Sequence, residues 1–138
     1  MNYKEIAKKT IGHLYQSHNS IRQSGIDTSL VALAELRVSQ INGCAYCCHF
    51  HSGELRDMGI VQDLLDKLPG WKHSMIFNRK QVLTLKLAES ISLLDNNTEV
   101  ILEDMKNDFT EKEVVELTAS IALMNALNRL RISLGDKV

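Results

Sequence analysis

Proline is nearly absent from this 138-residue chain, and strand-like alternation of β-branched and polar residues is missing. Pro69 is the only proline, so little interrupts the helical patterns that recur along the sequence. No linker, low-complexity stretch or internal repeat divides the chain. We therefore expect one all-α domain over residues 1–138, built from about seven helices.

Long apolar runs, a basic stripe and an apolar leader are also lacking. The apolar runs are short and interrupted, which argues against a membrane span. The formal net charge is −1, which argues against a nucleic-acid partner. The opening residues, MNYKE, do not resemble a secretory signal. We expect a cytoplasmic protein that binds neither membranes nor nucleic acid.

Cysteine is scarce, and its three copies are confined to five residues. They are Cys44, Cys47 and Cys48. An odd number at this spacing does not build an extracellular disulfide framework. It is typical of a working thiol site in a reducing compartment.

Helix signals fill the rest of the chain. Asp27 or Thr28 can cap one helix that stops at Asn42 and Gly43, and Asn78 can cap another. Thr110 and Glu113 form a capping box, in which each side chain satisfies an orphan amide of the other residue. We expect helices over about 3–23, 28–42, 44–58, 61–68, 78–94, 98–106 and 110–134.

The last of these helices is apolar on most sides, so we expect it at the centre of the fold or at a subunit contact. Asn125 and Asn128 are polar exceptions on it, and each needs a hydrogen-bond partner if it is buried. We favour bonds across a subunit interface over bonds to the loop near the cysteines.

The cysteine helix brings several reactive groups to one face. At about 100° per residue, Cys47, Cys48 and His51 all lie within about 60° of Cys44, whereas His49 points the opposite way. Residues three apart inside a helix have β-carbons about 5–6 Å apart, but a disulfide needs about 3.5–4.5 Å. Cys44 must therefore occupy the irregular first position of the helix.

That first position has a chemical consequence. Unpaired amides and the helix dipole favour negative charge there and can lower the pKa of a thiol. His51 follows Cys47 by one turn and could accept its proton directly or through a water. The group Cys44, Cys47 and His51 therefore indicates reversible dithiol–disulfide chemistry.

The same residues resemble the carboxymuconolactone decarboxylase family, and within it the alkylhydroperoxidase D (AhpD)-like branch. Residues 36–47, LRVSQINGCAYC, followed by His51, are similar to the signature of that branch. Weaker similarity extends through Gly70-Trp71 and residues 87–89 to the segments 117–123 and 128–130.

The resemblance implies an all-helical homotrimer or homohexamer that reduces hydroperoxides. By this resemblance Cys47 attacks the peroxide and passes through a sulfenic acid, Cys44 resolves it into a disulfide, and His51 relays protons. Helix-start electrostatics alone would favour Cys44 as the more acidic thiol. A dithiol or lipoyl-type carrier would supply electrons, and we expect no cofactor and no resident metal.

Two positions depart from the pattern of the resembled branch. Its relay glutamate usually lies twelve residues before the first cysteine, where this chain has Ala32. Glu35 could substitute, the relay could be shorter, or Glu35 could be a solvated charge on the helix face. Cys48 could pair with Cys44, although we favour a role as a small buried apolar residue.

Three other functions remain open at this stage. Cys44, Cys47 and His51, with Cys48 or another residue as the fourth ligand, have suitable chemistry for zinc. No second Cys/His pair exists to complete such a site. A lactone-acid decarboxylase, as in the other branch of the family, would not need two thiols. The cysteines could also sense oxidation without turning over.

Overall fold

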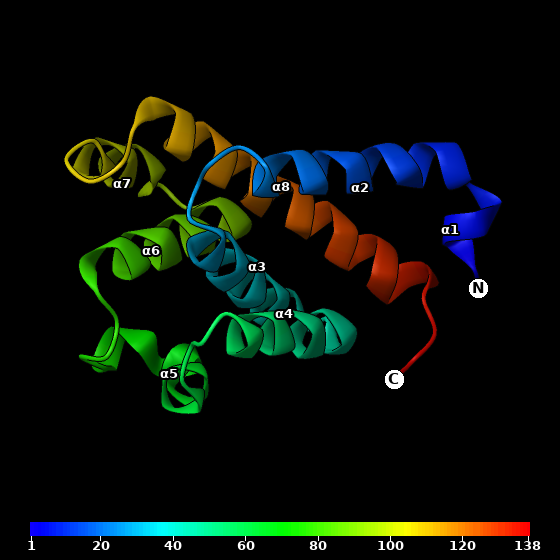
Figure 1. Cartoon of the computed structure of the whole chain (residues 1–138), viewed down its shortest axis with the longest axis horizontal. Coiled ribbons are helices and arrows are strands. Elements are labelled where there is room, and N and C mark those ends of the chain that lie inside the picture. The colour runs from blue at the N-terminus through cyan, green and yellow to red at the C-terminus, as the bar shows by residue number, and fades with distance from the viewer.

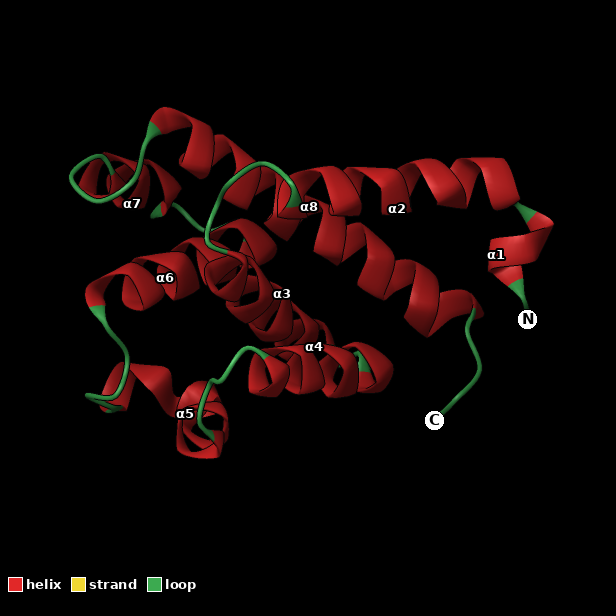
Figure 2. Ribbon diagram, in the orientation of Figure 1, coloured by secondary structure: helices red, strands yellow, loops and turns green.

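The computed structural model describes all 138 residues. They form eight α-helices and one short 3₁₀ segment, with no strand (Figure 2). The elements are α1 (Tyr3–Ile6), α2 (Lys8–Arg22), α3 (Thr28–Asn42), α4 (Ala45–Asp57), α5 (Gln62–Lys67), η1 (Leu68–His73), α6 (Arg79–Leu93), α7 (Thr98–Met105) and α8 (Glu111–Leu134). The all-α prediction is confirmed.

Helix α3 lies at the centre of the molecule (Figure 1). It packs against α4, α6 and α8, and nine of its fifteen residues are buried. Its residues Val31, Ala34 and Val38 belong to one apolar cluster, which α8 and α6 complete. Its residues Leu33 and Leu36 belong to a second cluster under α4, α5 and η1. Because α3 is buried in both apolar clusters, its position is fixed, and so is the start of α4, which follows it directly.

The predicted caps are present at several helix ends. Asp27 accepts a hydrogen bond from the amide of Ser29, and capping boxes open α6 at Asn78 and α8 at Thr110. One prediction was wrong in detail, because the first helix breaks at Ala7, whose backbone is not helical. A second difference follows Pro69, where the chain continues as the 3₁₀ segment η1 rather than stopping.

The last helix occupies the central position that its apolar sequence predicts. Helix α8 packs against α2, α3 and α6. Its last turn meets the start of the chain, where the amino group of Met1 donates to the carbonyl of Leu134 at 2.9 Å. Helix α1 is thereby held beside the carboxyl end of α8, and Figure 1 shows both termini at that end. No helix combines the length and apolarity needed to cross a bilayer.

Candidate active site

The junction between α3 and α4 sets the position of the first cysteine. Gly43 adopts a left-handed conformation (φ 71°), its amide donates to the carbonyl of Gln40, and the amide of Cys44 donates to that of Ser39. These bonds are a Schellman motif, which satisfies the last carbonyls of α3. Cys44 then becomes the N-cap of α4, as the disulfide geometry required.

Cys44 and Cys47 form a disulfide across the first turn of α4. Their Cα atoms are 5.3 Å apart, and the sulfur of Cys44 also accepts a hydrogen bond from the amide of Cys47 at 3.3 Å. Both residues are buried, with 2% of Cys44 and 8% of Cys47 exposed. The structure thus brings together the two sulfurs that the sequence singled out.

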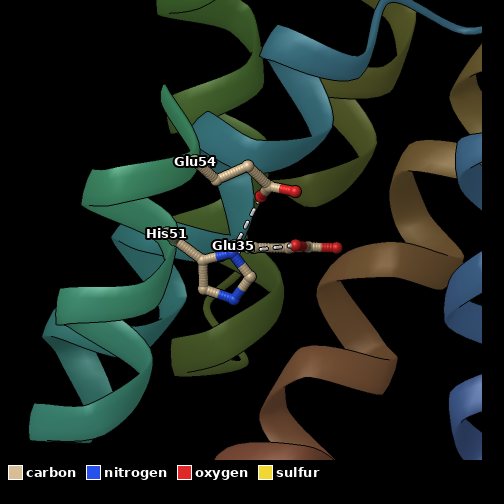
Figure 3. A group of neighbouring side chains, drawn as sticks. All are labelled: Glu35, His51 and Glu54. Carbon is tan, nitrogen blue, oxygen red and sulfur yellow. Dashed lines mark hydrogen bonds and ion pairs between the residues drawn. The ribbon is translucent and has the colours of Figure 1, made fainter. Parts of the chain in front are cut away.

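His51 lies one turn beyond Cys47 and points into the protein. It is buried, and its Nδ1 lies 3.3 Å from Oε2 of Glu35 and 3.2 Å from Oε1 of Glu54 (Figure 3). Because carboxylates only accept, Nδ1 carries the hydrogen, so Nε2 is the nitrogen that can accept a proton. Nε2 points away from both carboxylates (Figure 3). No hydrogen bond joins His51 to either sulfur of the disulfide.

Glu35 is a buried member of this site rather than a solvated charge. It is 1% exposed, and it accepts hydrogen bonds from Ser120 at 2.9 Å and from both terminal nitrogens of Arg22 at 2.8 and 2.7 Å. The interpretation of Glu35 as a charge on an exposed helix face was therefore wrong. The alternative, that Glu35 substitutes for the relay glutamate, is compatible with its position beside His51.

Arg22 joins the two carboxylates into one network. Its guanidinium donates to both oxygens of Glu35 and also to Glu54 at 2.8 and 3.2 Å. Burial alone would raise the pKa of Glu54, but hydrogen bonds from His51 and Arg22 lower it to about 2. Both carboxylates are therefore matched by cations or donors, and the network is well compensated for its burial.

The network could also be considered as a metal site. Ligand atoms of Glu35, His51 and Glu54 lie within 4.8 Å of one another. However, Arg22 already bonds the carboxylate oxygens that would hold a cation. The zinc hypothesis built on the cysteines meets a similar difficulty, because Cys44 and Cys47 are joined to each other and offer no thiolate in this state.

A pocket of about 280 Å³ opens beside the disulfide. Helix α4 contributes Tyr46, Cys47, Phe50 and His51 to its wall, and α8 contributes Met124 and Leu127. Cys44 does not line it. A reactant entering this pocket would therefore meet the sulfur of Cys47 and the ring of His51, within a largely apolar surface.

Comparisons with known proteins show the family and the fold of this chain. The sequence model of the carboxymuconolactone decarboxylase family matches residues 8–90. The chain belongs to this family. It is also 27% identical to the uncharacterized protein YdfG of Bacillus subtilis (strain 168), over 99% of this chain and 95% of the relative.

Among solved structures, this family member resembles a protein of unknown function from Agrobacterium tumefaciens, which has a proposed role as the antioxidant defence protein AhpD. The TM-score is 0.92 and the identity is 22%, over 99% of this chain and 95% of the other. At that identity the likeness establishes a shared fold, which is the fold that the sequence resemblance predicted.

This member of the carboxymuconolactone decarboxylase family departs from the expected relay at residue 32. Ala32 is fully buried in the apolar cluster beneath α4, where a carboxylate would have no partner. Glu35 lies one turn later and faces Arg22, His51 and Ser120 instead. In this chain the acidic group of α3 that lies beside His51 is therefore Glu35.

Three members of the network were missed by the sequence analysis. Glu54 follows His51 by three residues, a spacing that places two helical side chains together and could have revealed the pair. Arg22 and His18 come from α2, and neither has a companion at ligand spacing within that helix. His18 lies 3.4 Å from Arg22 and lines the pocket. Burial lowers the pKa of His18, so its neutral form is favoured.

Cys48 is free and half-buried, and it packs against the second apolar cluster. Burial raises the pKa of its thiol, which favours the protonated, unreactive form. The structure pairs Cys44 with Cys47 and not with Cys48. This agrees with the favoured role of Cys48 as a small apolar residue.

The asparagines of α8 bond within the chain, so the favoured prediction of intersubunit bonds was wrong. The side-chain nitrogen of Asn42 donates to Asn125 at 2.9 Å and to Asn128 at 3.1 Å, and Asn128 donates to Ser39 at 3.1 Å. Asn42 and Ser39 lie in the last turn of α3, directly before Cys44. These bonds therefore tie α8 to the junction that positions the disulfide.

Proposed function

We propose that this protein is a thiol-dependent peroxidase that reduces hydroperoxides through the Cys44–Cys47 pair. The observation that carries the proposal is the pocket in which Cys47 and His51 meet a reactant, with Cys44 already at bonding distance behind Cys47. Family membership and the AhpD-like fold are consistent with an antioxidant role. Two thiols and a proton carrier are the groups that this reaction needs.

The reaction begins from the reduced pair. Nε2 of His51 takes the proton of Cys47, directly or through a water, and the thiolate attacks the terminal oxygen of the hydroperoxide. The O–O bond breaks, the alkoxide takes the proton from His51 and leaves as an alcohol, and Cys47 becomes a sulfenic acid. Glu54 and Glu35 face Nδ1, and Arg22 holds these two carboxylates in place, so that Nε2 is left to exchange protons in the pocket.

Cys44 then completes the oxidative half of the cycle. Its thiol sulfur attacks the sulfur of Cys47, the disulfide forms, and the hydroxyl of the sulfenic acid leaves with the thiol proton as water. A dithiol or lipoyl-type donor in the cytoplasm restores the pair by attacking the sulfur of Cys47 through the pocket that Cys47 lines, while Cys44 leaves as a thiolate. The amide of Cys47, which already donates to Cys44, stabilises that leaving group. The donor ends as its own disulfide.

The pocket also bears on which of the two thiols attacks the peroxide. Electrostatics at the start of a helix would favour Cys44 as the attacking group, but Cys44 lies behind the pocket wall and Cys47 lines it. This difference in access supports Cys47 as the attacking thiol, and in the proposed cycle the helix start stabilises Cys44 as the leaving thiolate.

Cysteine substitution tests the proposal. With a dithiol donor and excess hydroperoxide, Cys47→Ser should abolish peroxide consumption, because serine cannot form a sulfenic acid. Without a donor, and with one equivalent of hydroperoxide, reduced Cys44→Ser should consume that equivalent and stop at the Cys47 sulfenic acid, which a dimedone-type probe would capture.

Cys48→Ala is the matched control, since it removes a neighbouring thiol and keeps the site apolar. It should retain turnover. Undiminished turnover by Cys47→Ser, or no turnover by the unsubstituted protein with any hydroperoxide, would overturn the proposal.

A further inference from the structure

Two cations at the mouth of the active-site pocket have no acidic partner. Lys4 and Arg131 both line the pocket, and neither forms an ion pair within the chain. The ammonium of Lys4 lies 4.7 Å from the ring centre of Tyr15, and the guanidinium of Arg131 lies 3.8 Å from that of Tyr46. Aromatic faces attract these cations but leave their charge available to an anion.

Arg131 carries a further unmet hydrogen-bonding group. Its Nε is buried and has no hydrogen-bond partner, which is uncommon in folded proteins and calls for a physical explanation. The chain approaches this side chain closely at Gly135, where an added Cβ would lie 2.9 Å from Cδ of Arg131. Arg131 therefore packs closely against the chain at Gly135 while its Nε–H lacks a hydrogen-bond acceptor.

The contact between the two ends of the chain holds Lys4 and Arg131 at the same pocket. Met1 is bonded to Leu134 and to Asp136 beyond α8. These bonds hold α1, which carries Lys4, against the end of α8, which carries Arg131. Two helices from opposite ends of the sequence therefore place positive charge around one opening.

An apolar path connects this charged mouth to the sulfur. The ring of Tyr46 stacks on Phe50 at 6.4 Å, and Phe50 meets His51 edge-on at 5.1 Å. Met124 and Leu127 of α8 also line the pocket. A molecule that lies along this path would have an apolar body, a reactive end at Cys47 and a charged end at Arg131.

We propose that the pocket selects hydroperoxides whose apolar body ends in a carboxylate, with the carboxylate bound by Arg131 and Lys4. This inference rests on the peroxidase function proposed above. The volume of about 280 Å³ is at the lower end for small-molecule pockets, so compact acids fit better than long ones. His18 also lines the pocket, but burial lowers its pKa and favours its neutral form, so it adds no third positive charge there.

Three related peroxides test the inference with the unsubstituted protein. They are cumene hydroperoxide, its para-carboxylate and the methyl ester of that carboxylate, assayed with one neutral dithiol donor. The carboxylate should show a kcat/KM about tenfold above that of the ester, the lower end of what charge-assisted hydrogen bonds supply. High salt should reduce the ratio between the kcat/KM of the carboxylate and that of the ester, because it screens the charges.

A double substitution assigns the effect to the two cations. In Lys4→Met/Arg131→Met the ratio of carboxylate to ester rates should fall to about one, and this ratio cancels any general loss of activity. Lys9→Met/Arg56→Met removes the same charge from exposed positions outside the pocket and should keep the ratio.

The outcomes separate the two proposals. Consumption of all three peroxides without preference for the carboxylate would overturn the inference alone. Survival of the preference in the Lys4/Arg131 variant would also overturn it. Failure to consume any of the three would overturn the peroxidase function, and this inference with it.

Discussion

At the scale of single residues, the site is organised by the hydrogen bonds of one imidazole. The Nδ1 of His51 hydrogen-bonds to Glu54 and lies 3.3 Å from a carboxylate oxygen of Glu35, and Arg22 forms ion pairs with both acids. Two carboxylates this close would repel each other without the guanidinium between them. A fixed Nδ1–H leaves Nε2 as the group that exchanges protons in the pocket, which is the property that the proposed chemistry requires.

Glu54→Gln tests the electrostatic part of this description. Since the pKa of Glu54 in the folded protein is about 2, below its ordinary value, its ionised form stabilises the fold above about pH 4.5. That stabilisation, up to about 3 kcal/mol, should vanish as the pH falls to about 2. The variant should be less stable at pH 7 and lose less stability across this window, as urea denaturation at several pH values would measure.

Glu99→Gln is the matched control, because Glu99 is exposed and has no ion-pair partner. Its stability should follow that of the unsubstituted protein across the same pH range. If the stability of Glu54→Gln depends on pH in the same way as that of Glu99→Gln, then Arg22 and His51 do not hold Glu54 ionised.

At the scale of elements, the six residues from Ser39 to Cys44 serve two helices at once. The amide of Cys44 closes the Schellman motif of α3, and its side chain caps α4. Both functions depend on the left-handed conformation of Gly43. The backbone that ends one helix is therefore the backbone that places the first sulfur within reach of the second.

Gly43→Ala should destabilise the oxidised protein by about 1 kcal/mol, because a Cβ disfavours the left-handed conformation. An added Cβ would meet no atom within 4 Å, so the cost comes from the backbone alone. Gly12→Ala, within α2 and equally unobstructed, should stabilise by up to about 1 kcal/mol. Chemical denaturation would compare them, and equal stabilisation by both would contradict the proposed junction.

Element boundaries were predictable where the signal was local. Capping residues such as Asn78 and Thr110 act on amides within one turn, so the sequence contains both partners. The break at Ala7 has no such signal, because Ala is a good helix former. In the structure the break accompanies the docking of α1 at the end of α8, which is a contact between opposite ends of the chain.

At the scale of the whole molecule, the pocket is assembled from α1, α2, α4 and α8. Periodicity predicted that Cys44, Cys47 and His51 share one face, because all three lie on one helix. It could not predict that Arg22 and His18 cross to that face, or that Arg131 lies over Tyr46. Such placements depend on how helices pack, which the spacing of residues within one helix does not determine.

The most direct test of the central claim is a disulfide map by mass spectrometry, made after the fully reduced protein receives one equivalent of hydroperoxide. The structure predicts a single linkage between Cys44 and Cys47, with Cys48 recovered as a free thiol. A linkage through Cys48, or a product in which Cys44 and Cys47 remain reduced, would contradict the account.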